Sequence, residues 1–302
     1  MSNNNLLITI VGPTAVGKTS VSVQLAKYYG CEVISADSRQ FFMEMAIGTA
    51  KPSLDEMDGI PHHFIDFLGV EEEMSAGAFE EAAVKKLQHL FKTNNKAILT
   101  GGSGLYVKAL IDGMSEMPAP PPEIRSQIMA ELESEGLDGL LNELENSDPD
   151  YFEYVDHKNH QRIVRALEMI RFTGMPFSSF RNGSERERDF DIVKIGLELE
   201  REVLYQRINA RVDQMVASGL EDEVKSLVSK KELNALQTVG YKEIFDYLDG
   251  KYDRDEAIRL IKRNTRRYAK RQLTWFKKDE EVRWFKPMEI DEIVAYIDRS
   301  TT

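Results

Sequence analysis

The sequence predicts an α/β protein, in which a parallel sheet is covered by helices and interrupted by a helical insertion. Short apolar runs rich in β-branched residues alternate with longer stretches of helical periodicity. Three of these runs, 6–11, 32–36 and 97–100, are followed directly by glycine or a polar residue, as strands of open parallel sheets are beside a ligand site. A proline-rich segment at 117–122 then opens a region with helical patterns and no obvious strand.

The first run leads into an octet that matches the phosphate-binding loop template, Gly12-Pro13-Thr14-Ala15-Val16-Gly17-Lys18-Thr19. In this template the glycines let backbone amides fold around phosphate oxygens, the lysine reaches the terminal phosphates, and the Thr19 hydroxyl can hold Mg²⁺. A helical pattern follows as far as Tyr29, and the N-terminus of a helix presents unpaired N–H groups to an anion. We therefore predict a P-loop NTPase-like sheet core with Mg²⁺ as its cofactor.

The second run ends at Asp37-Ser38-Arg39-Gln40. Because ligands bind beyond the carboxyl ends of parallel strands, Asp37 should lie close to the phosphate loop. An acid there could bind Mg²⁺, cap a turn or act as a general base, and its position does not choose among the three. Further along, the segment 61–66 leads into another short strand and contains two adjacent histidines, His62 and His63. In a strand they point to opposite faces, and the sequence has no Cys cluster or HExxH pattern, so a metal role is not favoured.

The third run ends in a glycine-rich turn, Gly101-Gly102-Ser103. Many phosphate-loop ATPases instead hold Mg²⁺ with an acid at the end of a strand here. A glycine turn would let backbone amides and the Ser103 hydroxyl approach a second set of phosphate oxygens. A tight turn that merely opens the next helix is the alternative. Between the second and third runs, Ser75 is placed to cap a predicted helix at 75–92.

The order of these patterns predicts two parts: an α/β core formed by 1–116 and 191–302, and a helical insertion domain at 117–190. Helices are expected in the insertion at 124–133, 137–145 and 159–172, followed by a loop at 175–189. The core resumes with a strand at 191–199 and is then helix-rich. Its later elements are expected at 201–217, 220–229, 241–248, 254–278, a strand at 282–285 and a closing helix.

Charge is distributed unevenly along the chain. The formal net charge is −12, yet the segment 259–278 contains nine lysines and arginines and no acid. A basic helix on an otherwise acidic protein attracts a polyanion locally while the rest discourages non-specific binding. A solvated helix face is the alternative, but such faces normally mix both signs. We therefore expect this helix to bind a polyanion.

Composition describes an ordinary soluble globular protein, with 30% charged and 42% apolar residues. The N-terminal segment lacks the basic and apolar regions of a signal peptide, and no apolar run reaches the length of a membrane span. We expect a cytoplasmic protein with no membrane association and no protein partner, and a monomer. The single cysteine, Cys31, is expected to be a small buried thiol.

Seven motifs in the same order resemble the signatures of the tRNA dimethylallyltransferases, or tRNA isopentenyltransferases (the IPP transferase family): 12–19, 37–40, 47–52, 61–63, 101–106, 239–242 and 269–275. The resemblance spans 8–275. Eukaryotic members commonly add a zinc-finger tail, whereas this sequence ends soon after the shared region and has one cysteine, so we expect the bacterial form. It implies transfer of a dimethylallyl group from dimethylallyl pyrophosphate to N6 of the adenosine immediately 3′ of the anticodon in tRNA, with release of pyrophosphate.

The resemblance also implies roles for single residues. Lys18, the loop amides and Mg²⁺ would stabilise charge on the departing pyrophosphate, and Ser103 would lie near its bridging oxygen. Asp37 matches the general base for the adenine amino group. Of two arginines in the helix after the 191–199 strand, Arg207 and Arg211, we expect Arg211 to hold the pyrophosphate.

The adenine must leave its stacked position to reach a buried electrophile, so we expect an extended surface for the anticodon stem-loop. The insertion would grip the anticodon arm, and the basic helix would hold phosphates. Trp275 is expected to be a core residue rather than a stacking platform. The residues expected to contact tRNA are Asp37, Ser38, Arg39, Gln40, Ser103, Arg125, Gln161, Arg162, Ile163, Val164, Arg165, Gln237, Thr238, Val239, Gly240, Tyr241, Lys242, Arg266, Arg267, Lys270 and Arg271.

Three alternatives remain open at the level of sequence. A related isopentenyltransferase that modifies a free adenine nucleotide would not need the insertion or the basic helix. A phosphate-loop kinase or ATPase is suggested by the loop alone and disfavoured by the missing acid at the strand end. A non-catalytic RNA-binding protein explains the basic helix but leaves the phosphate loop and Asp37 without a role.

Overall fold

The computed structural model describes residues 5–115, 117–180 and 186–300. The chain divides into two compact units, a core unit formed by 1–112 and 187–302 and an insertion unit formed by 113–186. Each boundary lies four residues before the one expected from the sequence.

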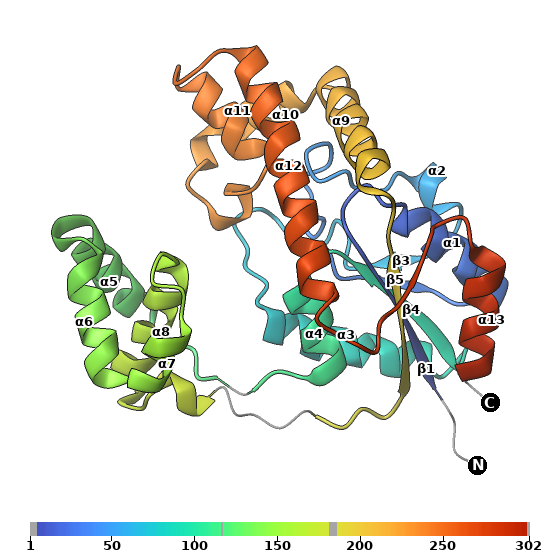
Figure 1. The fold of residues 1–302 in the computed structure, drawn as a ribbon, viewed down its shortest axis with the longest axis horizontal. Coiled ribbons are helices and arrows are strands. Elements are labelled where there is room, and N and C mark those ends of the chain that lie inside the picture. Colours follow the sequence, from blue (N-terminus) through green and yellow to red (C-terminus); the bar gives the residue numbers. More distant parts are fainter. Residues whose placement is uncertain (1–4, 116, 181–185, 301–302) are drawn as a thin grey trace. The chain divides into compact units, whose positions relative to one another are not determined.

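The core unit is built on a six-stranded sheet in which every pairing is parallel (Figure 1). The strand order is β3-β2-β4-β1-β5-β6, so β1 lies inside the sheet between β4 and β5. The predicted parallel α/β sheet is therefore confirmed. The strands are β1 (Leu6–Val11), β2 (Val33–Ser35), β3 (His62–His63), β4 (Lys96–Gly101), β5 (Asp191–Leu197) and β6 (Arg283–Phe285).

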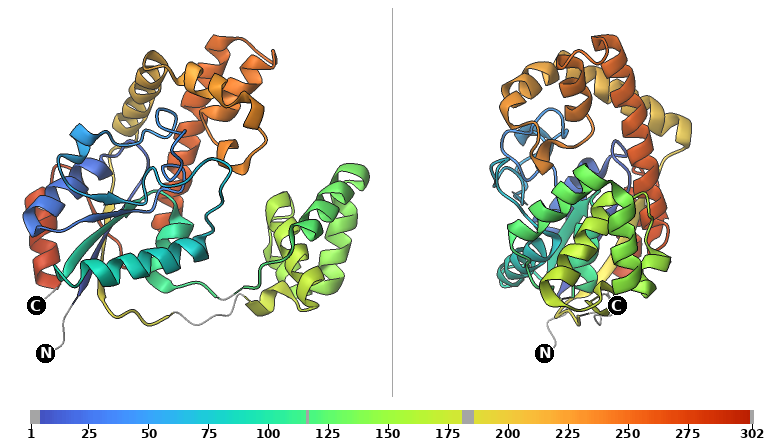
Figure 2. Two further views of the ribbon diagram at one scale, coloured as in Figure 1. Left: turned by 180° about the vertical axis from the view of Figure 1, so that it is seen from behind. Right: turned by 90° about the vertical axis from the view of Figure 1, so that its left-hand side faces the viewer.

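Successive residues of the strands pack in two different hydrophobic cores, one on each face of the sheet, because successive side chains of a strand point to opposite faces. Leu7 and Leu99 pack with α3 (Ala76–Leu90) and α4 (Gly104–Asp112). Ile8, Ile10 and Ile98 pack with α1 (Lys18–Tyr29) and α13 (Ile290–Ser300) on the opposite face. Figures 1 and 2 show these helix pairs on the two sides of the sheet. Burying each such aliphatic side chain stabilises the fold by roughly 1.5–3 kcal/mol.

The topology brings three loops to one edge of the sheet. In the parallel register Val11 lies opposite Gly101, and Ser35 lies opposite Thr100, so β1, β2 and β4 end at the same level. The loops that follow these strands carry the phosphate-loop octet, Asp37 and Ser103. This edge is where ligands bind in open α/β sheets.

The C-terminal half of the core unit is helix-rich, as expected. The 23-residue helix α12 (Arg254–Phe276) contacts α4, α9 (Arg201–Ala217) and α11 (Tyr241–Leu248). Its N-terminus is capped by Asp253, whose side chain accepts from the backbone N–H of Glu256. The helical segments after β5 are α9 (Arg201–Ala217), α10 (Leu220–Ser226), η2 (Val228–Lys230), η3 (Asn234–Leu236), α11 (Tyr241–Leu248) and α12 (Arg254–Phe276).

The insertion unit has its own hydrophobic core, which includes Ile128, Leu144 and Leu167. Its described residues contain helices and no strand, as the sequence predicts. The predicted loop at 175–189 contains a short 3-10 helix, and its residues 181–185 lie outside the described residues. The elements are α5 (Pro122–Glu135), α6 (Leu137–Ser147), α7 (Pro149–Tyr154), α8 (His160–Thr173) and η1 (Phe177–Phe180).

Two short helices are absent from the sequence prediction, α7 in the insertion and α2 (Leu54–Met57) in the core unit. Each has too few residues to show a helical period, but their caps are strong: Ser53 and Glu56 form a capping box on α2, and Asp148 caps α7. Cys31 is buried, as expected. In the part of the chain that the structure describes, none of the helices is both long and apolar enough to cross a membrane.

Candidate active site

The phosphate-loop octet lies between β1 and α1, where its backbone turns sharply at Gly12. Gly12 has a φ of 148°, and a Cβ at this position would lie 2.6 Å from the carbonyl oxygen of Leu197. Another residue therefore cannot occupy it without moving β5. Gly17 precedes the first turn of α1, so the free N–H groups of the helix face the loop.

Lys18 points into this loop. Its Nζ donates to the carbonyl oxygens of Gly12, at 3.0 Å, and Pro13, at 2.9 Å. Desolvation lowers the pKa of Lys18 to about 8, with Asp37 opposing the shift and Arg211 adding to it. The three charged groups are thus close enough to influence one another, in the region where the sequence places the phosphates.

Asp37 lies two residues after the end of β2 and faces the same region. One carboxylate oxygen accepts from the backbone N–H of Arg39 at 3.3 Å. Desolvation raises the pKa of the Asp37 carboxyl, while the Lys18 ammonium opposes the shift. A carboxyl group with a raised pKa beside a cation suits a general base better than a solvated surface acid does.

Ser103 lies in the turn after β4, beside the Asp37 turn. Its Oγ accepts from the backbone N–H of Ser38 at 3.0 Å and lies 3.1 Å from the Ser38 hydroxyl. Tyr268 of α12 is also close, because Ser103 and Asp37 both influence its pKa, which desolvation raises to about 12. The structure therefore brings Lys18, Asp37 and Ser103 together, as predicted.

Gln272 of α12 joins the two phosphate-facing turns, a role that the sequence did not indicate. Its buried side chain accepts from the backbone N–H of Thr14 at 2.8 Å and donates to the carbonyl oxygen of Gly102 at 2.9 Å. The residue belongs to the 269–275 motif, and this membership was its one available signal. Gln272 fixes the distance between the loops after β1 and β4.

A cavity of about 540 Å³ opens beside these groups. Asp37 and Thr14 line one part of it, and Arg211 of α9 lines another. Desolvation lowers the pKa of Arg211, which Asp37 and Arg207 also influence. Arg207 instead donates to the carbonyl oxygen of Val16 at 3.2 Å, so it supports the phosphate loop from outside. Arg211 therefore lies at the cavity, and its expected role as the ligand of the pyrophosphate stays a prediction.

Comparison with known proteins decides the family. A model of the family IPP transferase matches residues 40–279. The tRNA dimethylallyltransferase of Cytophaga hutchinsonii is 50% identical over 295 residues, which cover 98% of this chain and 97% of that protein. The tRNA dimethylallyltransferase of Christiangramia forsetii is 50% identical over 283 residues, 94% of each chain. The chain belongs to the IPP transferase family.

Solved structures agree with this assignment. The full-length tRNA isopentenylpyrophosphate transferase of Bacillus halodurans is 41% identical and matches with a TM-score of 0.74, over 99% of this chain and 97% of that one. A eukaryotic dimethylallyltransferase acting on tRNA is 28% identical and matches with a TM-score of 0.79, over 98% of this chain and 77% of that one. The core unit therefore has the P-loop-like fold of this transferase family.

Within this IPP transferase, the segment 237–242 borders the cavity, with one correction to its expected contacts. Gln237, Thr238 and Lys242 line the cavity and are accessible. Tyr241 is fully buried, and its hydroxyl donates to Glu223 at 2.6 Å. Its side chain therefore packs inside the protein, where it cannot contact tRNA.

Arg39 also has an internal role. Its Nη1 donates to the carbonyl oxygens of Asn234 and Ala235, each at 3.0 Å. Arg39 lines the cavity as well, yet this guanidinium nitrogen already holds the η3 segment against the Asp37 turn. Gln40 is likewise used inside its own loop, where Nε2 donates to the carbonyl oxygens of Thr49 and Ala50.

The basic helix α12 uses some of its cations for internal contacts. Lys262 pairs with Asp213, and Arg266 donates to Asn209 at 2.6 Å. Arg267, Lys270 and Arg271 are exposed, and none has an acidic partner among the described residues. These three are the cations most available to a polyanion, and two of them, Arg267 and Arg271, line the cavity.

Trp275, near the C-terminal end of α12, corrects an expectation. It was expected in the core, but 40% of the residue is exposed. Its indole ring packs over Gly104, where a Cβ would lie 2.2 Å from the ring nitrogen. One part of the ring is therefore covered by backbone while the rest remains accessible.

The residues of the insertion unit that were expected to contact tRNA lie on α5 and α8, and two of them are buried. Glu168 is buried and binds two arginines, Arg125 at 2.7 Å and Arg165 at 3.2 Å. Gln161 and Arg162 are exposed at the start of α8. Ile163 and Val164 are buried in the core of the unit, so their side chains stabilise it and are closed to a ligand. Neighbouring residues of α8 differ in burial because one face of the helix packs against the core of the unit and the other face is exposed.

Proposed function

We propose that this protein transfers a dimethylallyl group from dimethylallyl pyrophosphate to N6 of the adenosine immediately 3′ of the anticodon in tRNA. The observation that carries the proposal is the arrangement of Lys18 in the phosphate loop, with Asp37 beside it at the wall of one cavity. An allylic pyrophosphate needs an anion site for its leaving group, and a weakly nucleophilic amino group needs a base.

The transfer exchanges one bond at C1 of the dimethylallyl group for another and moves one proton. The bond from C1 of the dimethylallyl group to the pyrophosphate oxygen breaks, and its electron pair leaves with pyrophosphate. A bond forms between C1 and N6 of adenosine, and Asp37 accepts a proton from N6. Holding both reactants in one cavity replaces a bimolecular encounter in water by an oriented reaction.

The leaving group would be stabilised by groups already in place. Lys18 and the loop amides would bind the pyrophosphate, Arg211 would reach it from the cavity wall, and the Ser103 hydroxyl would donate to its bridging oxygen. Water should compete weakly with the N6 amino group as the nucleophile, because the acceptor nucleotide would fill the cavity once it has left its base stack.

Mg²⁺ is proposed as the cofactor, with the Thr19 hydroxyl as its ligand from the protein. Thr19 lies in the first turn of α1, directly after Lys18, so its hydroxyl is close to the position proposed for the phosphates. An ion bound there would take most of its ligands from phosphate oxygens and water. When bound, such an ion neutralises charge on the leaving group.

Transfer of label tests the proposal. The protein is incubated with dimethylallyl pyrophosphate labelled in the dimethylallyl group, with unmodified tRNA, AMP and ATP offered in parallel. We expect label in tRNA, and none when the adenosine 3′ of the anticodon is replaced by guanosine. Label entering AMP and not tRNA would assign the protein to the enzymes that modify free nucleotides. Phosphorylation or hydrolysis without label transfer would assign it to the kinases or ATPases.

A further inference from the structure

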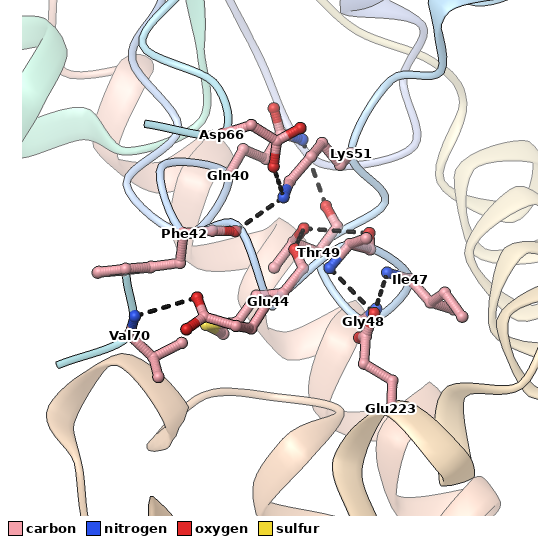
Figure 3. A network of polar contacts seen from close by, with 12 residues as sticks. Gln40, Phe42, Glu44, Ile47, Gly48, Thr49, Lys51, Asp66, Val70 and Glu223 are labelled. Carbon is pink, nitrogen blue, oxygen red and sulfur yellow. Dashed lines mark hydrogen bonds and ion pairs between the residues drawn. The ribbon is translucent and has the colours of Figure 1, made fainter. Parts of the chain in front are cut away.

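One carboxylate outside the cavity holds the loop that forms a wall of it. Glu223 of α10 accepts from three successive backbone N–H groups, those of Ala46 at 3.0 Å, Ile47 at 2.7 Å and Gly48 at 2.9 Å (Figure 3). The Tyr241 hydroxyl donates to the same carboxylate at 2.6 Å. Four hydrogen bonds therefore converge on one side chain.

These contacts fix the loop more firmly than neutral bonds would. Successive N–H groups that point to one place form an anion-binding concavity, and hydrogen bonds to a carboxylate are stronger than neutral ones. The Tyr241 ring also packs closely against Gly48, because a Cβ at this position would lie 2.4 Å from Cε2 of the ring. The loop can thus shift little while Glu223 and Tyr241 stay in place.

The same loop is joined to the catalytic turn. Gly48, Thr49 and Ala50 line the cavity. The carbonyl oxygens of Thr49 and Ala50 each accept from Nε2 of Gln40 at 3.3 Å, and the Gln40 backbone N–H donates to the carbonyl oxygen of Asp37 at 3.0 Å. A continuous series of hydrogen bonds therefore connects Glu223 with the turn that carries the proposed base.

The rest of the loop is held by nearby parts of the chain. Lys51 donates to the carbonyl oxygen of Phe42 at 2.7 Å and pairs with Asp66, and Glu44 accepts from the backbone N–H of Val70 at 3.1 Å (Figure 3). Glu223 differs from these contacts, since it reaches the loop from a helix more than 170 residues away. It fixes the loop against the helix-rich part of the core unit.

We propose that Glu223 is a positioning residue for dimethylallyl transfer, which acts by holding the loop 46–50 as the cavity wall beside Asp37. This inference rests on the proposed function. Glu223 does not line the cavity itself, so its effect on the reaction passes through the loop. Loss of its charge should therefore lower kcat more than it weakens tRNA binding.

The test compares Glu223→Gln with the matched control Glu221→Gln, from the same helix. Glu221 pairs with Lys225 and Arg254 and makes no contact with the loop among the described residues. Glu223→Gln should lower kcat about tenfold to a hundredfold, the range that small misplacements of reacting groups produce. The Kd for tRNA should stay within about twofold. Glu223→Asp, which keeps the charge, should recover part of the loss.

Hydrogen exchange gives an independent measure of the contact. The backbone amides of Ala46, Ile47 and Gly48 should exchange faster in Glu223→Gln than in the wild type or in Glu221→Gln. If Glu223→Gln does not fold, Gly48→Ala displaces the same loop with the carboxylate retained, and should lower kcat in the same way.

Three outcomes would overturn the inference. They are an active Glu223→Gln with kcat within twofold of the wild type, an equal loss in Glu221→Gln, and unchanged exchange at the three amides. A wild-type protein that transfers no dimethylallyl group would instead refute the proposed function, and with it the role of Glu223 in that reaction. The two failures are therefore distinguishable.

Discussion

Replacing Gln272 with leucine should loosen the two turns that face the proposed pyrophosphate. Gln272 accepts from the Thr14 N–H at 2.8 Å and donates to the Gly102 carbonyl at 2.9 Å, from a buried position. Leucine has a similar volume but neither polar atom. The buried Gly102 carbonyl and the partly buried Thr14 N–H would each lose a partner, at a cost of about 1–3 kcal/mol per group. The expected decrease in the free energy of unfolding is thus about 2–6 kcal/mol.

Urea denaturation measures this decrease, with exposed Gln214→Leu on α9 as the control. The control should stay within about 0.5 kcal/mol of the wild type, as surface substitutions usually do. Calorimetry with inorganic pyrophosphate should show at least about a tenfold weaker Kd for Gln272→Leu, equivalent to 1.4 kcal/mol. Equal stability of the two variants, or unchanged pyrophosphate affinity in Gln272→Leu, would refute the bridging role.

Two further predictions concern charge. Desolvation lowers the pKa of Lys18 to about 8, and an ammonium is charged below its pKa, so pyrophosphate affinity in the wild type should fall as pH rises through about 8. In Lys18→Arg the affinity should stay level to pH 10, and a wild-type affinity that is equally level would contradict this assignment. Replacing Arg267, Lys270 and Arg271 with glutamine should weaken tRNA binding and reduce the slope of log K against log salt by about 3 if each meets one phosphate. A slope equal to that of the wild type would place these cations away from the RNA.

The sheet and its ligand edge were predictable because their signals are local. The apolar run Leu6–Val11, the octet after it and the acid at position 37 each follow from a few neighbouring residues. Parallel pairing then places the ends of β1, β2 and β4 together. The short strand expected at this segment, β3, contains His62 and His63, and it ends there because residues 64–66 bend, with positive φ angles at Phe64 and Asp66.

The hydrogen bonds that hold the loops of the site in place were not predictable, because they join distant parts of the chain. Gln272 and Thr14 are 258 residues apart, and Glu223 and Ile47 are 176 apart. Nothing in the sequence around either residue indicates its partner. Such contacts form when α10 and α12 pack against the loops of the sheet, which is a property of the complete fold.

Motif membership also failed to distinguish packing from binding. Tyr241, Ile163 and Val164 belong to segments expected to contact tRNA, yet all three side chains are buried. Trp275 shows the opposite error, since an aromatic residue expected in the core is partly exposed. A motif in a helix includes inward-facing and outward-facing positions, and their burial separates the two.

The central claim is that Asp37 accepts the proton while the phosphate loop holds the leaving group. The measurement that tests it most directly is the single-turnover rate of Asp37→Asn with tRNA and dimethylallyl pyrophosphate at saturation, beside the exposed control Asp55→Asn. We predict a rate about 10²–10⁴-fold below that of the control, the usual contribution of a general base, with tRNA affinity nearly unchanged. A normal rate accompanied by a large loss of tRNA affinity would contradict the claim.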